Sequence, residues 1–186
     1  MEKEVLIGVS ARHVHLTKDA YEQLFDHDLT VKSPLYQTGE FAALETVTIK
    51  TEKGVFQNVR IIGPLRNYNQ VEISRSDARK LCLFPPIRKS GDLQGASPIT
   101  IATEKGEITV DACIIANRHV HMNEQDASSF GVKDGQMVTL AIDGEKSGQV
   151  DVAVKITANG KLEAHLDTDD ANAFLLETGD KKKLII

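Results

Sequence analysis

The tetrapeptide RHVH stands at residues 12–15 and again at residues 118–121. The chain has only six histidines, and these two copies hold four of them: His13, His15, His119 and His121. On a β-strand, residues i and i+2 point to the same face. Each copy would therefore present two imidazoles side by side, with its valine turned to the opposite layer. The repetition predicts a chain built twice from one pattern.

The elements around the two copies follow the same order in both halves. An apolar run leads into RHVH, and the polar stretch after it predicts a helix capped by Thr17 or Asn123. A hairpin follows, with its turn at residues 52–54 or 143–148, and each half closes with a short strand entering a helix. We therefore expect a mainly β protein with short helices, made of two similar small β-barrel domains that arose by internal duplication.

The domain boundaries are placed from composition. Residues 85–98 (PPIRKSGDLQGASP) are rich in Pro, Gly and Ser and predict a linker. This gives a first barrel lobe over residues 1–84 and a second over residues 99–186, with an N-terminal strand that could pack across the lobes. Residues 99–113 predict a further hairpin leading into the second RHVH copy. The first half is the longer one, and its extra length is expected in SPLYQTGEF (33–41).

A third metal ligand in each half comes from the repeat. Aligning QVEISRSDA (70–78) with EAHLDTDDA (163–171) without gaps places Glu72 opposite His165. Each half then offers three nitrogen or oxygen ligands and leaves a coordination position open, as catalytic zinc sites do. The set favours zinc, with cobalt, manganese or iron as alternatives. One HxH pair could simply be packed or exposed, but two copies with matched third positions favour two metal ions. His27 has no counterpart and is expected in an exposed loop.

The bulk composition limits the class of protein. Apolar residues make up 41% of the chain and charged residues 26%, which is typical of a globular protein. A formal net charge of −5 argues against nucleic-acid binding, and no apolar run reaches the length of a membrane span. The N-terminus lacks the pattern of a signal peptide. Cys82 and Cys113 lie in apolar contexts, so we expect buried free thiols in a cytoplasmic protein.

The chain resembles the propanediol-utilisation type of phosphotransacylase, the phosphate propanoyltransferase family, over almost its whole length. The resemblance rests on GVSARHVHLT (8–17), GPLRNYNQVEIS (63–74), PIRKSGD (86–92), IIANRHVHM (114–122) and HLDTDDANA (165–173). It implies two β-barrel domains with two metal ions, usually zinc, in a site between them. It also implies the reversible conversion of acyl-CoA plus phosphate to acyl phosphate plus CoA.

The resemblance assigns roles to individual residues. It implies that His13, His15 and Glu72 hold one zinc ion, and that His119, His121 and His165 hold the other. Arg66 matches the family's phosphate-binding, catalytic arginine. The implied CoA contacts are Val9, Ser10, Ala11, Lys53, Arg60 and Asn172.

For the chemistry, we expect phosphate to attack the thioester directly, since no repeat-matched base accompanies either cysteine. Arg12 and Arg118 are expected on the strand face opposite the histidines, where they could support the site or carry charge at the lobe interface. The alternatives are a two-metal hydrolase of thioester or phosphate substrates and a non-catalytic metal-binding module. Neither acetyl-CoA nor propanoyl-CoA is favoured by any residue.

The N-terminal residues bear on the cellular location of the protein, and the strand edges bear on its assembly. Only about four residues precede VLIGVS, so the N-terminal extension that sends family members to bacterial microcompartments is expected to be absent, which favours the cytoplasm. Exposed strand edges would allow a homodimer.

Overall fold

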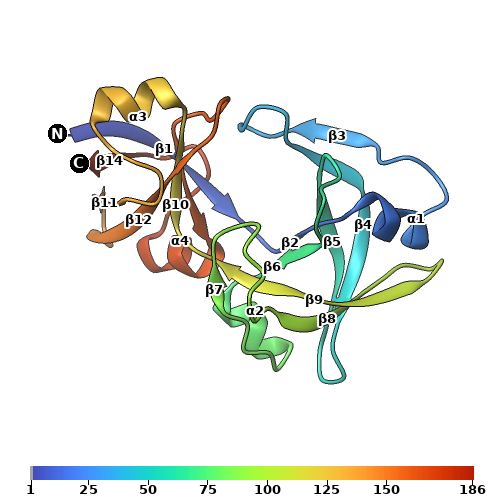
Figure 1. Ribbon diagram of the computed structural model, residues 1–186. Helices are drawn as coiled ribbons and strands as arrows, with labels where there is room; N and C mark the ends of the chain where they lie inside the picture. Colours follow the sequence, from blue (N-terminus) through green and yellow to red (C-terminus); the bar gives the residue numbers. More distant parts are fainter. Residues whose placement is uncertain (1) are drawn as a thin grey trace. The chain divides into compact units, whose positions relative to one another are not determined.

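The computed structural model describes residues 2–186 and divides them into two compact units. The terminal unit comprises the residues up to Ala11 together with Asn117–Ile186, and the central unit comprises Arg12–Ala116. Each unit has its own cluster of buried hydrophobic side chains. Figure 1 labels helices and strands of both units.

The terminal unit is a closed six-stranded barrel. Its strands follow one another around the barrel in the order β1 (Glu2–Ser10), β13 (Glu163–Asp167), β10 (His119–Met122), β12 (Gly148–Ile156), β11 (Met137–Ile142) and β14 (Lys181–Ile185), and β14 pairs with β1 to close it. Two helices belong to this unit: α3 (Glu124–Phe130) and α4 (Thr168–Phe174).

The central unit is a second six-stranded barrel with two additional strands. Its ring runs through β9 (Glu107–Ala116), β6 (Gln70–Glu72), β2 (His13–His15), β5 (Val55–Gly63), β4 (Phe41–Lys50) and β8 (Ser97–Ala102), and β8 pairs with β9 to close it. The short strands β3 (Val31–Pro34) and β7 (Ile87–Arg88) extend it beside β4 and β9. Its helices are α1 (Lys18–Leu24) and α2 (Arg75–Lys80).

The two barrels have the same topology. When β9 is matched with β1, and each strand in turn around both rings, every pairing agrees in direction: parallel, antiparallel, parallel, and then antiparallel for the remaining three. The prediction of a mainly β protein with two similar barrels and short helices is confirmed. The extra length of the first half lies between its first helix and its first long strand, where residues 25–40 include β3 while the terminal unit has only residues 131–136.

The domain boundaries predicted from the sequence differ from those of the structure. The strand that leads into each RHVH copy belongs to the other barrel, because β1 pairs with β13 and β14, and β9 pairs with β6 and β8. Residues 99–116 therefore belong to the central unit and not to a second lobe over 99–186. The proposed linker also lies in the central unit, where β7 pairs with β9 and the amide of Ile115 donates to the carbonyl of Pro86. The sequence allowed for an N-terminal strand that packs across the lobes, and β1 does pair within the terminal unit, but the same was not expected of β9.

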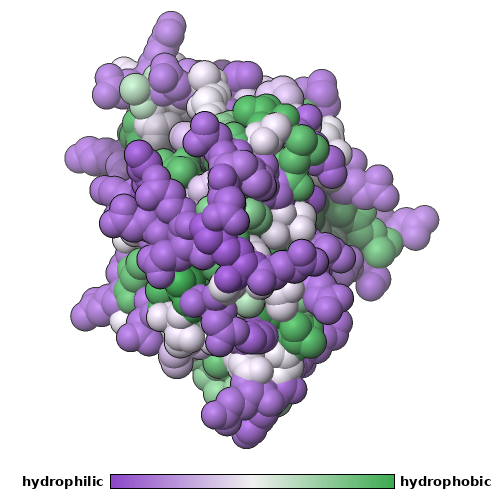
Figure 2. Space-filling model, turned by 90° about the vertical axis from the view of Figure 1, so that its right-hand side faces the viewer, coloured by the Kyte–Doolittle hydropathy of each residue, from purple (hydrophilic) through white to green (hydrophobic). Residues whose placement is uncertain are grey.

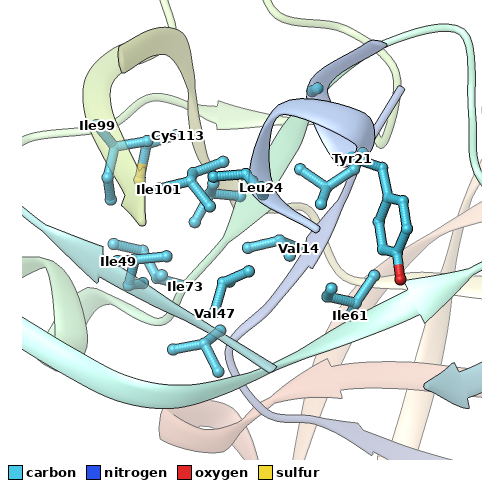
Figure 3. Close-up of a cluster of buried hydrophobic side chains, with 14 of the residues drawn as sticks. Val14, Tyr21, Leu24, Val47, Ile49, Ile61, Ile73, Ile99, Ile101 and Cys113 are labelled. Carbon is cyan, nitrogen blue, oxygen red and sulfur yellow. The ribbon is translucent and has the colours of Figure 1, made fainter. Parts of the chain in front are cut away.

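The barrel interiors are filled by every second residue of the strands. In the central unit, Val14, Ile61 and Val71 lie on three neighbouring strands, and all are fully buried. Figure 3 shows Val14 and Ile61 within the cluster that also receives side chains from α1, β4, β8 and β9. Val120, Val154 and Ala164 occupy the equivalent positions in the terminal unit. The interior therefore fixes which face of each strand remains for the histidines.

Helix starts are fixed by side-chain caps. The side chains of Thr17 and Asn123 accept from the amides of Ala20 and Asp126, as the sequence predicted.

Across residues 2–186, none of the helices is long and apolar enough to cross a membrane. On the face shown in Figure 2, hydrophilic residues predominate and hydrophobic residues form separate patches.

Candidate metal centres

The RHVH strands present their histidines away from the barrel interiors. Val14 and Val120 are fully buried in the two cores, so the flanking histidines project from the opposite face of β2 and β10. The ring centroids lie 4.9 Å apart for His13 and His15, and 4.7 Å apart for His119 and His121. The predicted side-by-side pairs are present in both units.

Strand register brings the third residue to each pair. His13 lies opposite Glu72 between β2 and β6, and His119 lies opposite His165 between β10 and β13. This is the correspondence that the gap-free alignment of the repeat gave. The His13 Nε2 atom is 3.5 Å from Glu72 Oε2, and the His165 ring centroid lies 5.1 Å and 4.6 Å from those of His119 and His121.

We call these sets the central tripod (His13, His15, Glu72) and the terminal tripod (His119, His121, His165). Within the described residues, these are the two groups of three or more potential ligands whose donor atoms all lie within 4.8 Å of one another. Zinc–nitrogen bonds of about 2.0–2.1 Å at tetrahedral angles place ligand atoms about 3.4 Å apart. Both donor sets, N₂O and N₃, suit zinc, and three protein ligands leave a position for substrate. The residues therefore fit the metal that the sequence implied.

Backbone carbonyls orient two of the imidazoles. The Nδ1 atom of His15 lies 3.0 Å from the carbonyl oxygen of Ile62, and that of His119 lies 2.8 Å from the carbonyl oxygen of Asn117. A carbonyl can only accept, so Nδ1 carries the proton and Nε2 keeps its lone pair for a metal. The Nε2 atoms of His119 and His121 are 3.0 Å apart, which is consistent with both facing one cation.

The central tripod lies in a strongly desolvated environment. Burial, together with the neighbouring His13 and Arg66, lowers the pKa of His15 to about 3. Neutral imidazole is the form that binds metals. The terminal tripod is more accessible, since 24% of the His165 side chain is exposed whereas only 5% of the His13 side chain is.

Arg66 lies close enough to the central tripod for its charge to affect His15. Its Nη2 atom donates to Glu40 Oε1 at 2.9 Å, and its Nη1 atom donates to the hydroxyl of Tyr68 at 2.6 Å and to Ser90 Oγ at 3.3 Å. The guanidinium is thus held in place beside the tripod, with 19% of the side chain exposed. A bidentate cation in such a position suits an anion such as phosphate.

The first residue of each RHVH copy forms an ion pair that sequence reasoning did not assign. Arg12 donates from Nε and Nη2 to the two carboxylate oxygens of Asp77, each at 3.0 Å, and Arg118 donates from Nε to Asp170 at 2.9 Å. Asp77 and Asp170 lie at the starts of α2 and α4, directly after the strands that carry Glu72 and His165. The repeat alignment places these two aspartates at equivalent positions and could have revealed both Arg–Asp ion pairs.

The residues implied as CoA contacts divide between the units. Val9 and Ser10 end β1, Ala11 follows it, and Asn172 is exposed on α4, all in the terminal unit. Lys53 lies in the β4–β5 turn and Arg60 lies on β5 opposite His13, both exposed in the central unit. Their joint role in binding CoA stays a prediction.

Both cysteines are free, but their environments differ. Cys113 is buried, and burial raises the pKa of its thiol to about 12. Cys82 is exposed, contrary to the expectation of a buried thiol, because α2 ends at Lys80 and Cys82 adopts a positive φ of 54° directly after it. His27 is exposed, as predicted, with 61% of its side chain accessible.

Comparison with known proteins places the chain among acyltransferases. A family model described as phosphate propanoyltransferase matches residues 6–177. Proteins of the same name are 48% identical over 180 residues in Lachnoclostridium phytofermentans and 46% identical over 180 residues in Priestia megaterium. These alignments cover 94% and 95% of this chain and 84% and 83% of the relatives. A third, from Thermotoga maritima, is 44% identical over 184 residues, covering 96% of this chain and 88% of its own.

Proposed function

This chain belongs to the phosphate propanoyltransferase family of acyltransferases, and we propose that it is a phosphotransacylase with one zinc ion at each tripod. It would convert acetyl-CoA or propanoyl-CoA plus phosphate to acyl phosphate plus CoA, reversibly. The observation that carries the proposal is the anchored guanidinium of Arg66 beside the neutral, buried His15 of the central tripod. The proposed phosphate-binding residue and the proposed metal ligands of the central tripod thus lie close together within one unit.

The role of Arg66 follows from its contacts. Tyr68 and Ser90 hold the Nη1 side of the guanidinium, while Glu40 occupies Nη2. An incoming phosphate dianion would compete with the Glu40 carboxylate for Nη2 and would be fixed by a charged fork matching its oxygens. Arg66 would therefore bind and orient phosphate for reaction.

In the proposed reaction, a phosphate oxygen attacks the thioester carbonyl carbon, the carbon–sulfur bond breaks and CoA leaves as its thiolate. Zinc bound at a tripod supplies a Lewis acid for negative charge on oxygen and a partner for thiolate sulfur. The neutral His15, with its proton held on Nδ1 by the Ile62 carbonyl, keeps its Nε2 lone pair available for ligation. Glu72 provides the carboxylate of the same tripod.

We propose transfer without an acyl-enzyme. Cys113 belongs to the central hydrophobic cluster, and a thiol with a pKa near 12 supplies almost no thiolate at neutral pH. Cys82 is exposed after α2 and belongs to neither tripod. For CoA, we propose contacts from the backbone of Val9, Ser10 and Ala11 and from Lys53, Arg60 and Asn172.

One assay tests the proposal against its alternatives. Purified protein is given acetyl-CoA or propanoyl-CoA, and thiol release is followed with and without phosphate, before and after removal of metal by a chelator. We expect thiol release that requires phosphate, yields acyl phosphate, stops on chelation and returns with zinc. Release without phosphate, yielding the free acid, would show a hydrolase. Metal binding without turnover would show a binding module, and either result would overturn the proposal.

A further inference from the structure

Each third ligand is hydrogen-bonded by the residue two positions before it on the same strand. The Nε2 atom of Gln70 donates to Glu72 Oε1 at 2.6 Å, and Glu163 Oε2 lies 2.7 Å from His165 Nε2. Gln70 and Glu163 are equivalent in the fold, because they lie opposite His15 and His121 in the same antiparallel register. Both are buried, with relative exposures of 0% and 5%.

The orientation of the Gln70 amide is fixed by its neighbours. The backbone amide of Gly91 donates to Gln70 Oε1 at 2.7 Å, and a backbone amide can only donate. The Nε2 group must therefore face the other way, toward Glu72 Oε1 and toward Ser90 Oγ at 2.9 Å. Gln70 thus contacts Oε1 of Glu72, whereas Oε2 lies on the side of His13, 3.5 Å from His13 Nε2.

The terminal unit uses the opposite hydrogen-bond polarity. The Glu163 carboxylate can only accept, so His165 Nε2 carries the proton and the other ring nitrogen keeps its lone pair. Gly8 makes room for this pair, because a Cβ at that position would lie 2.8 Å from Glu163 Oε1 and 2.8 Å from His165 Cδ2. Ile114 stands at the corresponding position opposite Glu72. A carboxylate ligand thus has a donor behind it, and an imidazole ligand has an acceptor.

We propose that Gln70 and Glu163 are positioning residues, each matched in hydrogen-bond polarity to the metal ligand it holds. The inference rests on the metal assignment of the proposed function and adds two residues to it. Orienting contacts of this kind typically change metal affinity about 10–100-fold when they are removed. In the central unit the network extends further, since Ser90 accepts from both Gln70 and Arg66. Gln70 therefore links the metal ligand Glu72 to the proposed phosphate-binding arginine.

The central unit is tested by Q70E, which places a carboxylate against Glu72. Zinc is titrated into metal-free protein in competition with a chromophoric chelator, which reports the number of sites and their Kd values. We expect one of two sites to weaken at least tenfold. The matched control is Q57E, which adds the same charge at an exposed position of β5. Unchanged or tighter binding in Q70E would overturn the proposal, and the Tm of the metal-free variant shows whether it is folded.

In the terminal unit, the metal ligand itself can be exchanged for a carboxylate, because glutamate is smaller than histidine. H165E sets two carboxylates against each other and should weaken one site at least tenfold. E163Q in that background restores a donor–acceptor pair and should recover most of the loss. E163Q in the wild type should weaken binding, because a neutral amide oxygen is a weaker acceptor for the His165 Nε2–H group than a carboxylate. A substitution that weakens one background and strengthens the other reports polarity matching, which structural damage cannot imitate. The proposal fails if E163Q acts in the same direction in both.

These outcomes are separable from the failure of the proposed function. Wild-type protein that binds two zinc ions without phosphotransacylase activity would overturn the function and leave the positioning roles intact. Wild-type activity with zinc affinities unaltered by Q70E and H165E would overturn the positioning roles alone. Protein that binds no zinc would overturn both.

Discussion

The central and terminal barrels share one strand order but differ in what surrounds their tripods. The central tripod is buried and has Arg66 nearby, while the terminal tripod is partly accessible. The terminal loop that corresponds to the one bearing Arg66, residues 157–162, contains no arginine. Glu40, which holds Arg66, comes from residues 25–40, the segment that is longer in the central unit. The barrel thus supplies the metal ligands, and its loops distinguish one tripod from the other.

The largest effect is expected from removing either tripod. H13A/H15A and H119A/H121A should each reduce bound zinc from two ions to one per chain. Turnover should fall by about a thousandfold or more, because a metal Lewis acid contributes several kcal/mol to the transition state. Zinc content and kcat are measured together. If one double variant kept near wild-type turnover after losing its ion, the two tripods would not share the catalytic function.

Substitution of Arg66 tests whether the central tripod, unlike the terminal tripod, has an anion-binding residue beside it. R66A should lower kcat/KM for phosphate by about 10–100-fold, since hydrogen bonds to charged groups contribute about 1.5–3 kcal/mol. The KM for acyl-CoA should change little, and R66K should recover only part of the loss because lysine lacks the bidentate fork. The control is N159A, an exposed position in the corresponding terminal loop. Equal damage to both substrates in R66A would indicate a structural role.

The paired aspartates should differ in their contribution to stability. The Asp77 side chain is 7% exposed and accepts two hydrogen bonds from Arg12, while Asp170 is 21% exposed and accepts one from Arg118. D77A should lower the free energy of unfolding by about 2 kcal/mol and D170A by about 1 kcal/mol or less. Urea denaturation measures both. A larger loss in D170A would contradict the burial argument.

The smallest effect on activity is expected at the cysteines. Cys113 lies opposite Val71 as Ile7 lies opposite Ala164, so it fills a core position of the barrel. An alkylating reagent at pH 8 should modify Cys82 in the folded protein and Cys113 only after unfolding, with turnover preserved. The double variant C82A/C113A should likewise keep most of its activity. Loss of turnover in a folded double variant would support an acyl-enzyme.

The raised pKa of Cys113 has a further consequence at alkaline pH. Burial favours the neutral thiol in the folded state, so its stabilising contribution is complete below the ordinary thiol pKa of about 9. That contribution declines as pH rises from there toward the folded value of about 12. C113A should therefore unfold with a weaker dependence on pH in this range than the wild type. The same dependence in both proteins would contradict the assigned burial effect.

By itself, the sequence determined the duplicated pattern, the helix caps and the six tripod residues, because periodicity and local capping are encoded by neighbouring residues. The alignment of Glu72 with His165 succeeded because each residue lies on a short strand that leads directly into a capped helix. The tertiary structure decided that β1 and β9 each belong to the barrel that does not contain the RHVH copy they precede. It also decided the contacts of Gln70, Glu163 and Arg66, and the exposure of Cys82. Strand pairing and side-chain hydrogen bonds join residues distant in the chain, and their free energies depend on which surfaces meet when the barrels close.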